Sequence, residues 1–306
     1  MKTVITKSIV ALLIGTSLLS CKESADKKQK ETVTESQEDV NVKNFGGLAL
    51  YTLRDDMGSD AKETLKAVAD AGYEYIEAAG YEDGEFYGMS PLEFKAYLDE
   101  LGLTPVSTHQ GSVTLENAEE MMADVKEAGF QYFVIPVPPM GLFTFDQATK
   151  TMGMTSTPKE LSEIVNELGE KADEAGLQLL YHNHDFEFMK DDNGLVPIDY
   201  LLENSDPKYV NFQMDLYWVT KAEADPIAYF DKYPGRFKIW HVKDMDDEGR
   251  FAPVGKGNID FKEILDQKEK SGMEYYMVEQ DMTFDGLEPL EAIKISHEGL
   301  KTIGFE

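Results

Sequence analysis

The feature that most constrains this 306-residue chain is an eightfold alternation of short strand-like runs and helix-like stretches. Several of the helix-like stretches stop at a glycine, as at Gly72, Gly129 and Gly176. The predicted strands cover residues 48–53, 73–77, 104–109, 131–137, 177–184, 209–215, 236–244 and 274–279. Because the alternation continues over residues 45–306 without a break in composition, it predicts one α/β domain, a (β/α)8 TIM barrel.

The predicted helices separate these strands and often begin at a capping residue. They cover residues 60–71, 91–101, 115–128, 157–175, 198–203, 226–233, 261–271 and 287–303, and residues 138–156 are predicted to form a long loop. Ser90-Pro91 is typical of an N-cap followed by a first-turn proline. A doubly wound sheet would need a glycine-rich phosphate loop after the first strand. Arg54-Asp55-Asp56-Met57-Gly58 stands there instead, which favours the barrel.

The N-terminus has the features of an export signal. Lys2 and Lys7 precede an apolar run at residues 9–19, and Leu18-Leu19-Ser20-Cys21 resembles a bacterial lipobox. We therefore expect residues 1–20 to be a lipoprotein signal peptide and Cys21 to be lipidated. This would attach the protein to a membrane of the bacterial cell envelope, on its periplasmic or surface side. The alternative is an ordinary secretory signal with a chance cysteine. Residues 21–44 are polar without aromatics, which predicts a flexible tether.

The formal net charge of −29 limits the class of partner. Residues 1–44 hold seven lysines and six acidic residues, so the acidic excess belongs to the barrel. Such a surface repels phosphate backbones, which argues against nucleic acid as a partner. Cys21 is the single cysteine, so an intramolecular disulfide is excluded. A homo-oligomer is compatible with the sequence.

Polar side chains gather where the predicted strands end. In a barrel, alternate strand residues point inward and catalytic groups lie at the C-terminal ends. The inward sets end in Glu77, in His109, in His182 and His184, in Asp215, in His241 and Lys243, and in Glu279 and Asp281. Four of the five histidines lie there, while His297 is expected on the surface of the last helix.

Four consecutive strand ends predict a metal site. Glu187 or a histidine of the fifth strand should converge with Asp215, His241 and Glu279. Three carboxylates at one point would raise each other's pKa sharply unless a cation neutralised them. A mixed oxygen and nitrogen shell suits one divalent metal ion, Mn²⁺, Mg²⁺, Co²⁺ or Zn²⁺.

Four motifs together resemble a known family. They are His-Asn-His-Asp-Phe-Glu at 182–187, Met-Asp-Leu-Tyr-Trp at 214–218, His-Val-Lys-Asp at 241–244 and Val-Glu-Gln-Asp at 278–281. They are similar to the xylose-isomerase-like TIM barrels of the sugar phosphate isomerase/epimerase superfamily, over about residues 46–306. The resemblance implies a Glu-Asp-His-Glu ligand set, in which Asp215, His241 and Glu279 match. Many members carry the first glutamate on the fifth strand, where this chain has His182. Glu187, reaching back from the loop, is the predicted ligand and His182 the alternative.

The resemblance also implies a metal-dependent isomerase or epimerase acting through an enediolate on a keto-sugar or keto-glycoside, with a lyase or dehydratase as the alternative. Glu187 and Glu279 are the predicted bases, and His184 and His109 their acid/base partners. The residues expected to contact a carbohydrate substrate are Lys243, Trp218, Tyr51 and Glu77.

Several alternatives stay open at this point. Lys243 would otherwise form a salt bridge to an inner carboxylate, and Trp218 would pack in the core. A lipid-anchored sugar-binding protein without turnover is the second function. A DNA-repair nuclease is disfavoured by the export signal and the acidic barrel. The envelope location favours unphosphorylated sugars.

Overall fold

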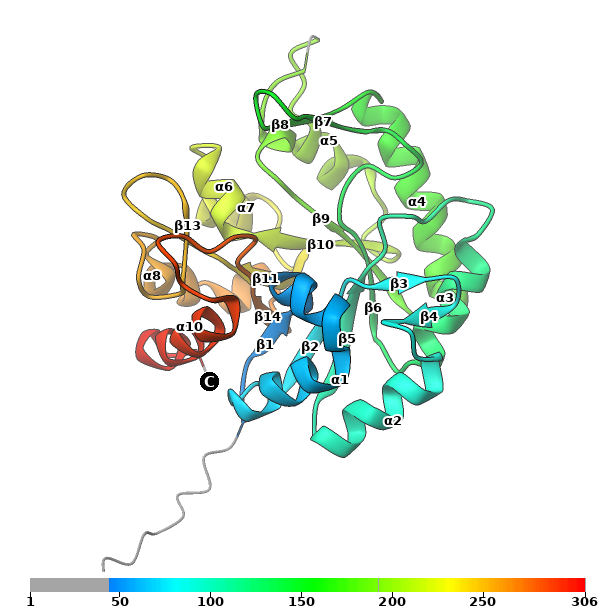
Figure 1. The fold of residues 1–306 in the computed structure, drawn as a ribbon. Helices are drawn as coiled ribbons and strands as arrows, with labels where there is room; N and C mark the ends of the chain where they lie inside the picture. The colour runs from blue at the N-terminus through cyan, green and yellow to red at the C-terminus, as the bar shows by residue number, and fades with distance from the viewer. Residues whose placement is uncertain (1–43, 192, 306) are drawn as a thin grey trace, which may run out of the picture. The chain divides into compact units, whose positions relative to one another are not determined.

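Eight parallel strands close into a barrel in the computed structural model, which describes residues 44–191 and 193–305 (Figure 1). Their order around the barrel is β1-β14-β11-β10-β9-β6-β5-β2. The strands are β1 (Gly47–Ala49), β2 (Tyr75–Ala78), β5 (Thr104–His109), β6 (Tyr132–Ile135), β9 (Gln178–His182), β10 (Val210–Asp215), β11 (Phe237–Val242) and β14 (Tyr275–Val278). This confirms the predicted (β/α)8 barrel. The predicted signal peptide, Cys21 and residues 22–43 of the tether lie outside the described residues.

Helices surround the strands (Figure 1). They are α1 (Arg54–Asp70), α2 (Pro91–Leu101), α3 (Ala118–Glu127), α4 (Pro158–Glu174), α5 (Pro197–Asn204), α6 (Leu216–Lys221), α7 (Pro226–Lys232), α8 (Phe261–Leu265), α9 (Lys268–Ser271) and α10 (Pro289–Ile303). Ser90 caps α2 with a capping box to Glu93, as its sequence predicts. Within the described part of the chain, none of these helices has the length and apolar character needed to cross a membrane.

The barrel interior holds a small apolar core that leads up to the polar strand ends. Its buried members are Ala49, Val106, Tyr132, Val134, Leu180, Ile239 and Met277. Leu180 precedes His182 on one face of β9, and Ile239 precedes His241 on one face of β11. Since alternate strand residues share a face, the residues two positions after Leu180, Ile239 and Met277, which are His182, His241 and Glu279, emerge at the mouth of the barrel.

The loops at the mouth contain more regular structure than the sequence predicts. The sequence predicts a first strand over residues 48–53, but β1 ends at Ala49 and residues 50–53 form the 3-10 helix η1 (Leu50–Leu53). The prediction is wrong there because so short an apolar run fits a strand or a helical turn equally well. The predicted loop 138–156 contains a hairpin, β7 (Phe143–Asp146) and β8 (Thr151–Met154). Two shorter hairpins are β3 (Tyr81–Glu82) with β4 (Glu85–Phe86), and β12 (Asp244–Met245) with β13 (Phe251–Ala252).

The expectation that His297 lies on the surface is wrong. Its side chain is buried, and its ring lies 4.3 Å from the ring of Phe45 and 4.9 Å from that of Tyr73. Its Nε2 is 3.3 Å from the Phe45 carbonyl oxygen. The imidazole therefore belongs to the inward face of α10, where it packs as an aromatic ring.

Candidate functional site

Three predicted metal ligands meet at the C-terminal mouth of the barrel. Asp215 ends β10, His241 lies on β11 and Glu279 follows β14, and one ligand atom of each lies within 4.8 Å of the others. His241 Nδ1 is 3.1 Å from Glu279 Oε2 and 3.9 Å from Asp215 Oδ2. All three side chains are buried. The cluster is therefore able to hold a divalent metal ion.

The donor atoms of this cluster fit such an ion. Asp215 Oδ2 is buried and receives no hydrogen bond from any described residue, although Lys243 Nζ lies 3.0 Å away as an ion pair. Two carboxylates and an imidazole nitrogen form the mixed oxygen and nitrogen set that divalent transition metals prefer. Burial opposes the charge of His241, but Glu77 and Glu279 raise its pKa to about 10. A metal ion would therefore take the place of the proton on Nδ1.

Lys243 lies among the carboxylates of this cluster. Its Nζ is 3.0 Å from Asp215 Oδ2, 2.6 Å from Glu279 Oε2 and 3.0 Å from Asp281 Oδ1. Burial would lower the pKa of Lys243, yet these carboxylates raise it well above its usual value. The structure thus shows the salt bridge that the sequence leaves as the alternative for Lys243, and the ammonium neutralises part of the buried negative charge.

Glu77 lies beneath the cluster with both carboxylate oxygens occupied. Oε1 accepts from Nε2 of His241 at 2.7 Å and faces Nε2 of His109 at 2.9 Å. Oε2 accepts from Ser107 Oγ at 2.7 Å and from the Gln213 amide. Burial would raise the pKa of Glu77, but the two imidazoles hold it well below its usual range. The sequence suggests that Glu77 contacts the substrate. In the structure its carboxylate is instead occupied by His241 and His109.

His182, the last residue of β9, and His184, two residues beyond it, extend this group of imidazoles. His182 Nδ1 is 2.9 Å from Gln213 Oε1, and His182 Nε2 is 3.9 Å from Asp215 Oδ2. The ring of His184 lies 5.0 Å from that of His182 and 5.3 Å from that of Trp218. Burial lowers the pKa of His182 well below its usual value and that of His184 to about 3. Both rings are therefore neutral near pH 7.

Trp218 and Tyr51 occupy different surroundings. Trp218 is 7% exposed and packs with Tyr217 and Phe251, which matches the core-packing alternative. Tyr51 is 42% exposed in η1 at the mouth, with the Arg54 guanidinium 4.8 Å from its ring centre. Of the two predicted aromatic contacts, Tyr51 is the one that remains accessible to a ligand.

The geometry does not support Glu187 as a metal ligand. Glu187 lies in the 3-10 helix η2 (Phe186–Phe188), fully buried, and neither group of potential ligand residues in the described chain includes it. Its Oε1 accepts from the Tyr181 hydroxyl at 2.9 Å and its Oε2 from the His184 backbone N–H at 2.9 Å. Tyr181 belongs to the apolar layer between strands and helices. The helical turn thus directs Glu187 to the outer side of β9, and His182 is the β9 residue beside the cluster.

The burial of Glu187 makes the free energy of unfolding depend on pH. It raises the pKa of Glu187 to about 8, although hydrogen bonds, among them those from the His184 backbone and the Tyr181 hydroxyl, act to lower it. Because this folded-state pKa exceeds the unfolded value of about 4.5, the neutral carboxyl stabilises the fold fully below pH 4.5. That contribution is lost as the pH rises through about 8. We expect Glu187→Gln to raise the free energy of unfolding at pH 9 by several kcal/mol, on the order of 1.4 kcal/mol per pKa unit, and to change it little at pH 4.5.

Denaturant unfolding at the two pH values measures this difference, and metal analysis of the same variant tests the ligand assignment. A Glu187→Gln protein that loses its bound metal would restore Glu187 as the ligand. Unchanged metal content leaves His182 as the candidate from β9.

The exposed large hydrophobic residues concentrate around the mouth, and we call them the apolar rim. The rim consists of Tyr51, Met140, Phe145, Met189, Leu195 and Met282, all in loops that follow barrel strands. Among the described residues, one further exposed large hydrophobic residue, Leu92, lies on α2 instead. The rim residues belong to loops that follow β1 and β14 on one side of the barrel order and β6 and β9 on the opposite side.

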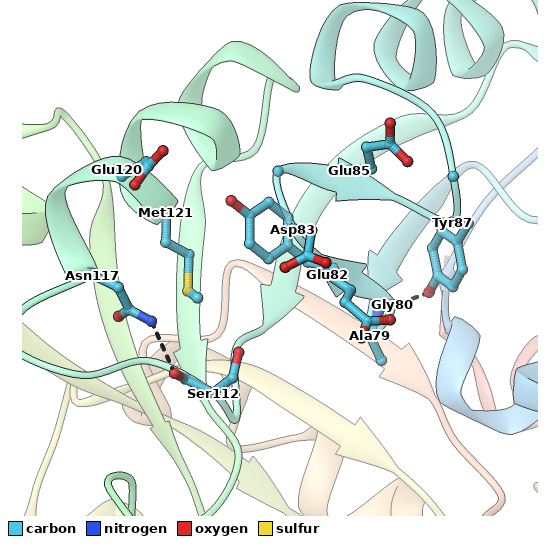
Figure 2. A pocket seen from close by; sticks show the side chains of 13 residues that line it. Ala79, Gly80, Glu82, Asp83, Glu85, Tyr87, Ser112, Asn117, Glu120 and Met121 are labelled. Atoms are coloured by element: carbon cyan, nitrogen blue, oxygen red, sulfur yellow. Dashed lines mark hydrogen bonds between the residues drawn. The ribbon is translucent and has the colours of Figure 1, made fainter.

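A large cavity of about 1110 Å³ lies beside the strand ends of β2 and β5, between the β3–β4 hairpin and the β5–α3 loop. Figure 2 shows the carboxylates of Glu82, Asp83 and Glu85 on the hairpin side and Glu120 on the α3 side. No member of the metal cluster lines it, and neither does any lysine or arginine. Its walls are suited to hydroxyl groups and repel phosphates.

Gln213 and Ser107 join the site although the sequence does not single them out. Both lie on the inward faces of their strands, which is the one signal that would have indicated them. Each follows a register shift, at Glu77–Ser107 between β2 and β5 and at Gln213–Ile239 between β10 and β11. Such irregularities re-aim side chains, and a pattern of alternation does not reveal them.

Solved structures with similar folds include a sugar phosphate isomerase/epimerase from Parabacteroides distasonis. It superposes with a TM-score of 0.71 at 25% identity, covering 89% of this chain and 98% of that one. A structure of L-ribulose 3-epimerase has a TM-score of 0.62 at 15% identity, covering 84% and 95% of the two chains, which shows the fold alone.

Curated relatives include inosose dehydratases. That of Lacticaseibacillus casei is 29% identical over 144 residues, covering 40% of this chain and 47% of that protein. The chain therefore spans about half the length of the relatives it matches first. The inosose dehydratase of Lactiplantibacillus plantarum is 23% identical over 274 residues, covering 79% of this chain and 88% of that protein. Residues 65–303 match the sequence model of the xylose isomerase-like TIM barrel family, which includes most of the barrel and every residue of the metal cluster. The chain belongs to the xylose isomerase-like TIM barrel family.

Proposed function

We propose that this protein is a divalent-metal-dependent enzyme that removes a proton next to the carbonyl of a keto-sugar or keto-glycoside. The resulting enediolate then eliminates a β-oxygen substituent or is reprotonated to an isomer. The observation that carries the proposal is the convergence of Asp215, His241 and Glu279 at the mouth of the barrel. The inosose dehydratase relatives support elimination, and the isomerase/epimerase neighbour supports reprotonation.

The metal site and Glu279 have different roles in the first half of the reaction. A bound divalent cation would polarise the substrate carbonyl and stabilise the negative charge of the enediolate. Burial opposes ionisation of Glu279, but Lys243 and His241 hold its pKa well below the usual range, so it is a carboxylate that accepts the carbon-bound proton. The electron pair of the broken C–H bond forms the new double bond.

His109 supplies the proton in the second half of the reaction. Burial opposes its charge, yet Glu77 raises the pKa of His109 above the usual value, and its side chain is 11% exposed. An imidazolium at this edge of the cluster donates its proton to the departing β-oxygen in elimination. In isomerisation Glu279 returns its proton to the neighbouring carbon, and the hydroxyl proton passes from one of the two substrate oxygens to the other.

The surroundings of the cluster support an unphosphorylated glycoside as substrate. The acidic cavity beside β2 and β5, which no member of the metal cluster lines, has no lysine or arginine to bind phosphate, and Lys243 in the cluster is already paired with carboxylates. The predicted lipid anchor at Cys21 would place the barrel outside the cytoplasm. The apolar rim lies where a substituent on the sugar would leave the mouth. We therefore favour a keto-glycoside with an apolar aglycone over a free keto-sugar.

Phe145 in the apolar rim tests this substrate class. We expect Phe145→Ser to raise KM for an aryl keto-glycoside by about tenfold, because roughly 1.5 kcal/mol of apolar contact is lost. KM for the corresponding free keto-sugar should stay the same. Leu92→Ser is the matched control, since Leu92 is exposed on α2 away from the mouth. Equal effects of both substitutions on both substrates would contradict an aglycone contact.

The proposed function is tested by solvent exchange in D2O. Metal-stripped protein is compared with protein resupplied with Mn²⁺, Co²⁺ or Zn²⁺, on keto-inositols, keto-sugars and 3-keto-glycosides. We expect metal-dependent deuterium incorporation or elimination product, detected by mass spectrometry. Binding of a substrate without exchange or product would instead identify a sugar-binding protein that lacks turnover.

A further inference from the structure

The side-chain amide of Gln213 connects the carboxylate of Glu77 to two imidazoles. Its nitrogen donates to Glu77 Oε2. Its oxygen lies 2.8 Å from His109 Nε2 and 2.9 Å from His182 Nδ1. Gln213 is fully buried, so the amide has no water with which to exchange these partners.

Chemistry fixes which way this amide points. Glu77 Oε1 faces the Nε2 atoms of His241 and His109 at 2.7 and 2.9 Å, and a carboxylate among such donors only accepts hydrogen bonds. The NH2 group of Gln213 must therefore face Glu77, and its oxygen must face the histidines. An amide oxygen accepts only, so the nitrogens opposite it, His109 Nε2 and His182 Nδ1, must both carry protons.

This protonation pattern leaves His182 with a lone pair on Nε2. A histidine binds a metal ion as the neutral imidazole, and in a neutral ring a proton on Nδ1, facing the Gln213 oxygen at 2.9 Å, means none on Nε2. That lone pair lies 3.9 Å from Asp215 Oδ2, which itself receives no hydrogen bond from the described residues. Lys243 Nζ forms an ion pair with this Asp215 oxygen at 3.0 Å, and a metal ion between the two acceptors would remove the repulsion between them. Donors that share one metal ion at about 2.0–2.2 Å lie about 3–4 Å apart, which fits this separation.

We infer that Gln213, held in place by Glu77, fixes the tautomer of His182 so that Nε2 becomes a fourth metal donor beside Asp215, His241 and Glu279. The inference rests on the metal dependence within the proposed function. Glu77 likewise fixes the tautomer of His241, because Glu77 Oε1 accepts the proton on His241 Nε2. Gln213 and Glu77 are thus positioning residues, which act through the ligands.

The resulting shell has two imidazoles and two carboxylates, with a net charge that a divalent cation cancels. A shell of three carboxylates and one imidazole would favour harder ions such as Mg²⁺. Imidazole nitrogens shift the preference towards Zn²⁺, Co²⁺ and Ni²⁺. We therefore expect the full-length protein to bind Co²⁺ and Zn²⁺ at least about 100-fold more tightly than Mg²⁺.

Nitrogen NMR of the histidine rings tests the tautomer directly in the wild-type protein. The chain has five histidines, so comparison with single histidine substitutions suffices to assign the two-bond ¹H–¹⁵N correlations of the wild type. We expect metal-free His182 to carry its proton on Nδ1 and its Nε2 signal to move when Zn²⁺ is added. A proton on Nε2 of His182, or an Nε2 signal unaffected by Zn²⁺, would overturn the inference.

Gln213→Met keeps the side-chain volume but removes the acceptor. We expect the His182 proton to move to Nε2, where Asp215 accepts it, and the Co²⁺ affinity to fall about 10- to 100-fold. His182→Ala should lower the affinity similarly and change the Co²⁺ absorption spectrum. Asn211→Leu is the matched control, because Asn211 is a buried amide on the same strand that bonds the Pro207 carbonyl.

The outcomes separate this inference from the proposed function. Wild-type affinity and spectrum in both Gln213→Met and His182→Ala would refute the fourth ligand even if turnover is metal-dependent. Tight Co²⁺ binding through His182 without turnover of any keto-sugar would support the inference and refute the proposed function.

Discussion

Replacing Lys243 with Met is expected to lower the melting temperature of the metal-free protein by about 10 °C. The ammonium is 1% exposed and lies within 3.0 Å of oxygens of Asp215, Glu279 and Asp281. Removing one partner of a buried ion pair costs about 3–5 kcal/mol, because the remaining charge stays buried without compensation. In a domain of this size each kcal/mol shifts the melting temperature by about 2–4 °C.

Divalent metal should reverse this loss. A cation at the cluster neutralises the carboxylates that Lys243→Met leaves unpaired, so Zn²⁺ should raise the melting temperature of the variant more than that of the wild type. Lys159→Met serves as the control, since Lys159 forms an exposed pair with Glu163 on α4. Equal Zn²⁺ shifts in variant and wild type, measured by calorimetry, would show that Lys243 and the metal do not share the carboxylates.

Asp215→Asn is expected to lower kcat/KM by about 100- to 1,000-fold, the range observed when one group that stabilises charge in a transition state is removed. The amide keeps the shape of the side chain but loses the charge that a metal ligand needs. Asp215 Oδ1 also caps α6 by accepting from the Trp218 N–H at 3.0 Å, and Asn preserves that cap. The fold should therefore survive while activity and bound metal are lost.

Asp225→Asn is the matched control for this substitution. Asp225 is an exposed N-cap aspartate of α7, accepting from the Ile227 N–H at 2.8 Å, and lies outside the cluster. Steady-state kinetics, metal analysis and circular dichroism of both variants give the comparison. An Asp215→Asn protein that retains its metal and its turnover would remove Asp215 from the site.

The positions of the strands and of three cluster residues follow from local patterns. The predicted strand 104–109 has the same bounds as β5, and the two-residue period places Asp215, His241 and Glu279 at the mouth. Asp215 ends β10, His241 is the last residue but one of β11 and Glu279 directly follows β14, so the strand ladder fixes the backbone direction at all three. Their sequence positions are therefore enough to predict where their side chains point.

The roles of Glu187 and Glu77 do not follow from such patterns. Glu187 comes after its strand has ended, and the turn of η2 directs its carboxylate to Tyr181 on the outer side of β9. Glu77 does point inward, but its neighbours come from three other strands that are distant in sequence. Those partners decide whether a buried carboxylate is open to a substrate or is hydrogen-bonded to a histidine.

The sequence alone determined the eightfold alternation, the closed barrel and the face on which chemistry occurs, because periodicity and strand direction are local properties. Tertiary structure alone decided the composition of the cluster. Lys243 lies among its carboxylates, and Glu77 and Gln213 form hydrogen bonds with each other and with its histidines. His182, and not Glu187, faces Asp215. These are contacts between side chains from different strands. Their geometry depends on barrel closure and on the register shifts beside Ser107 and Gln213.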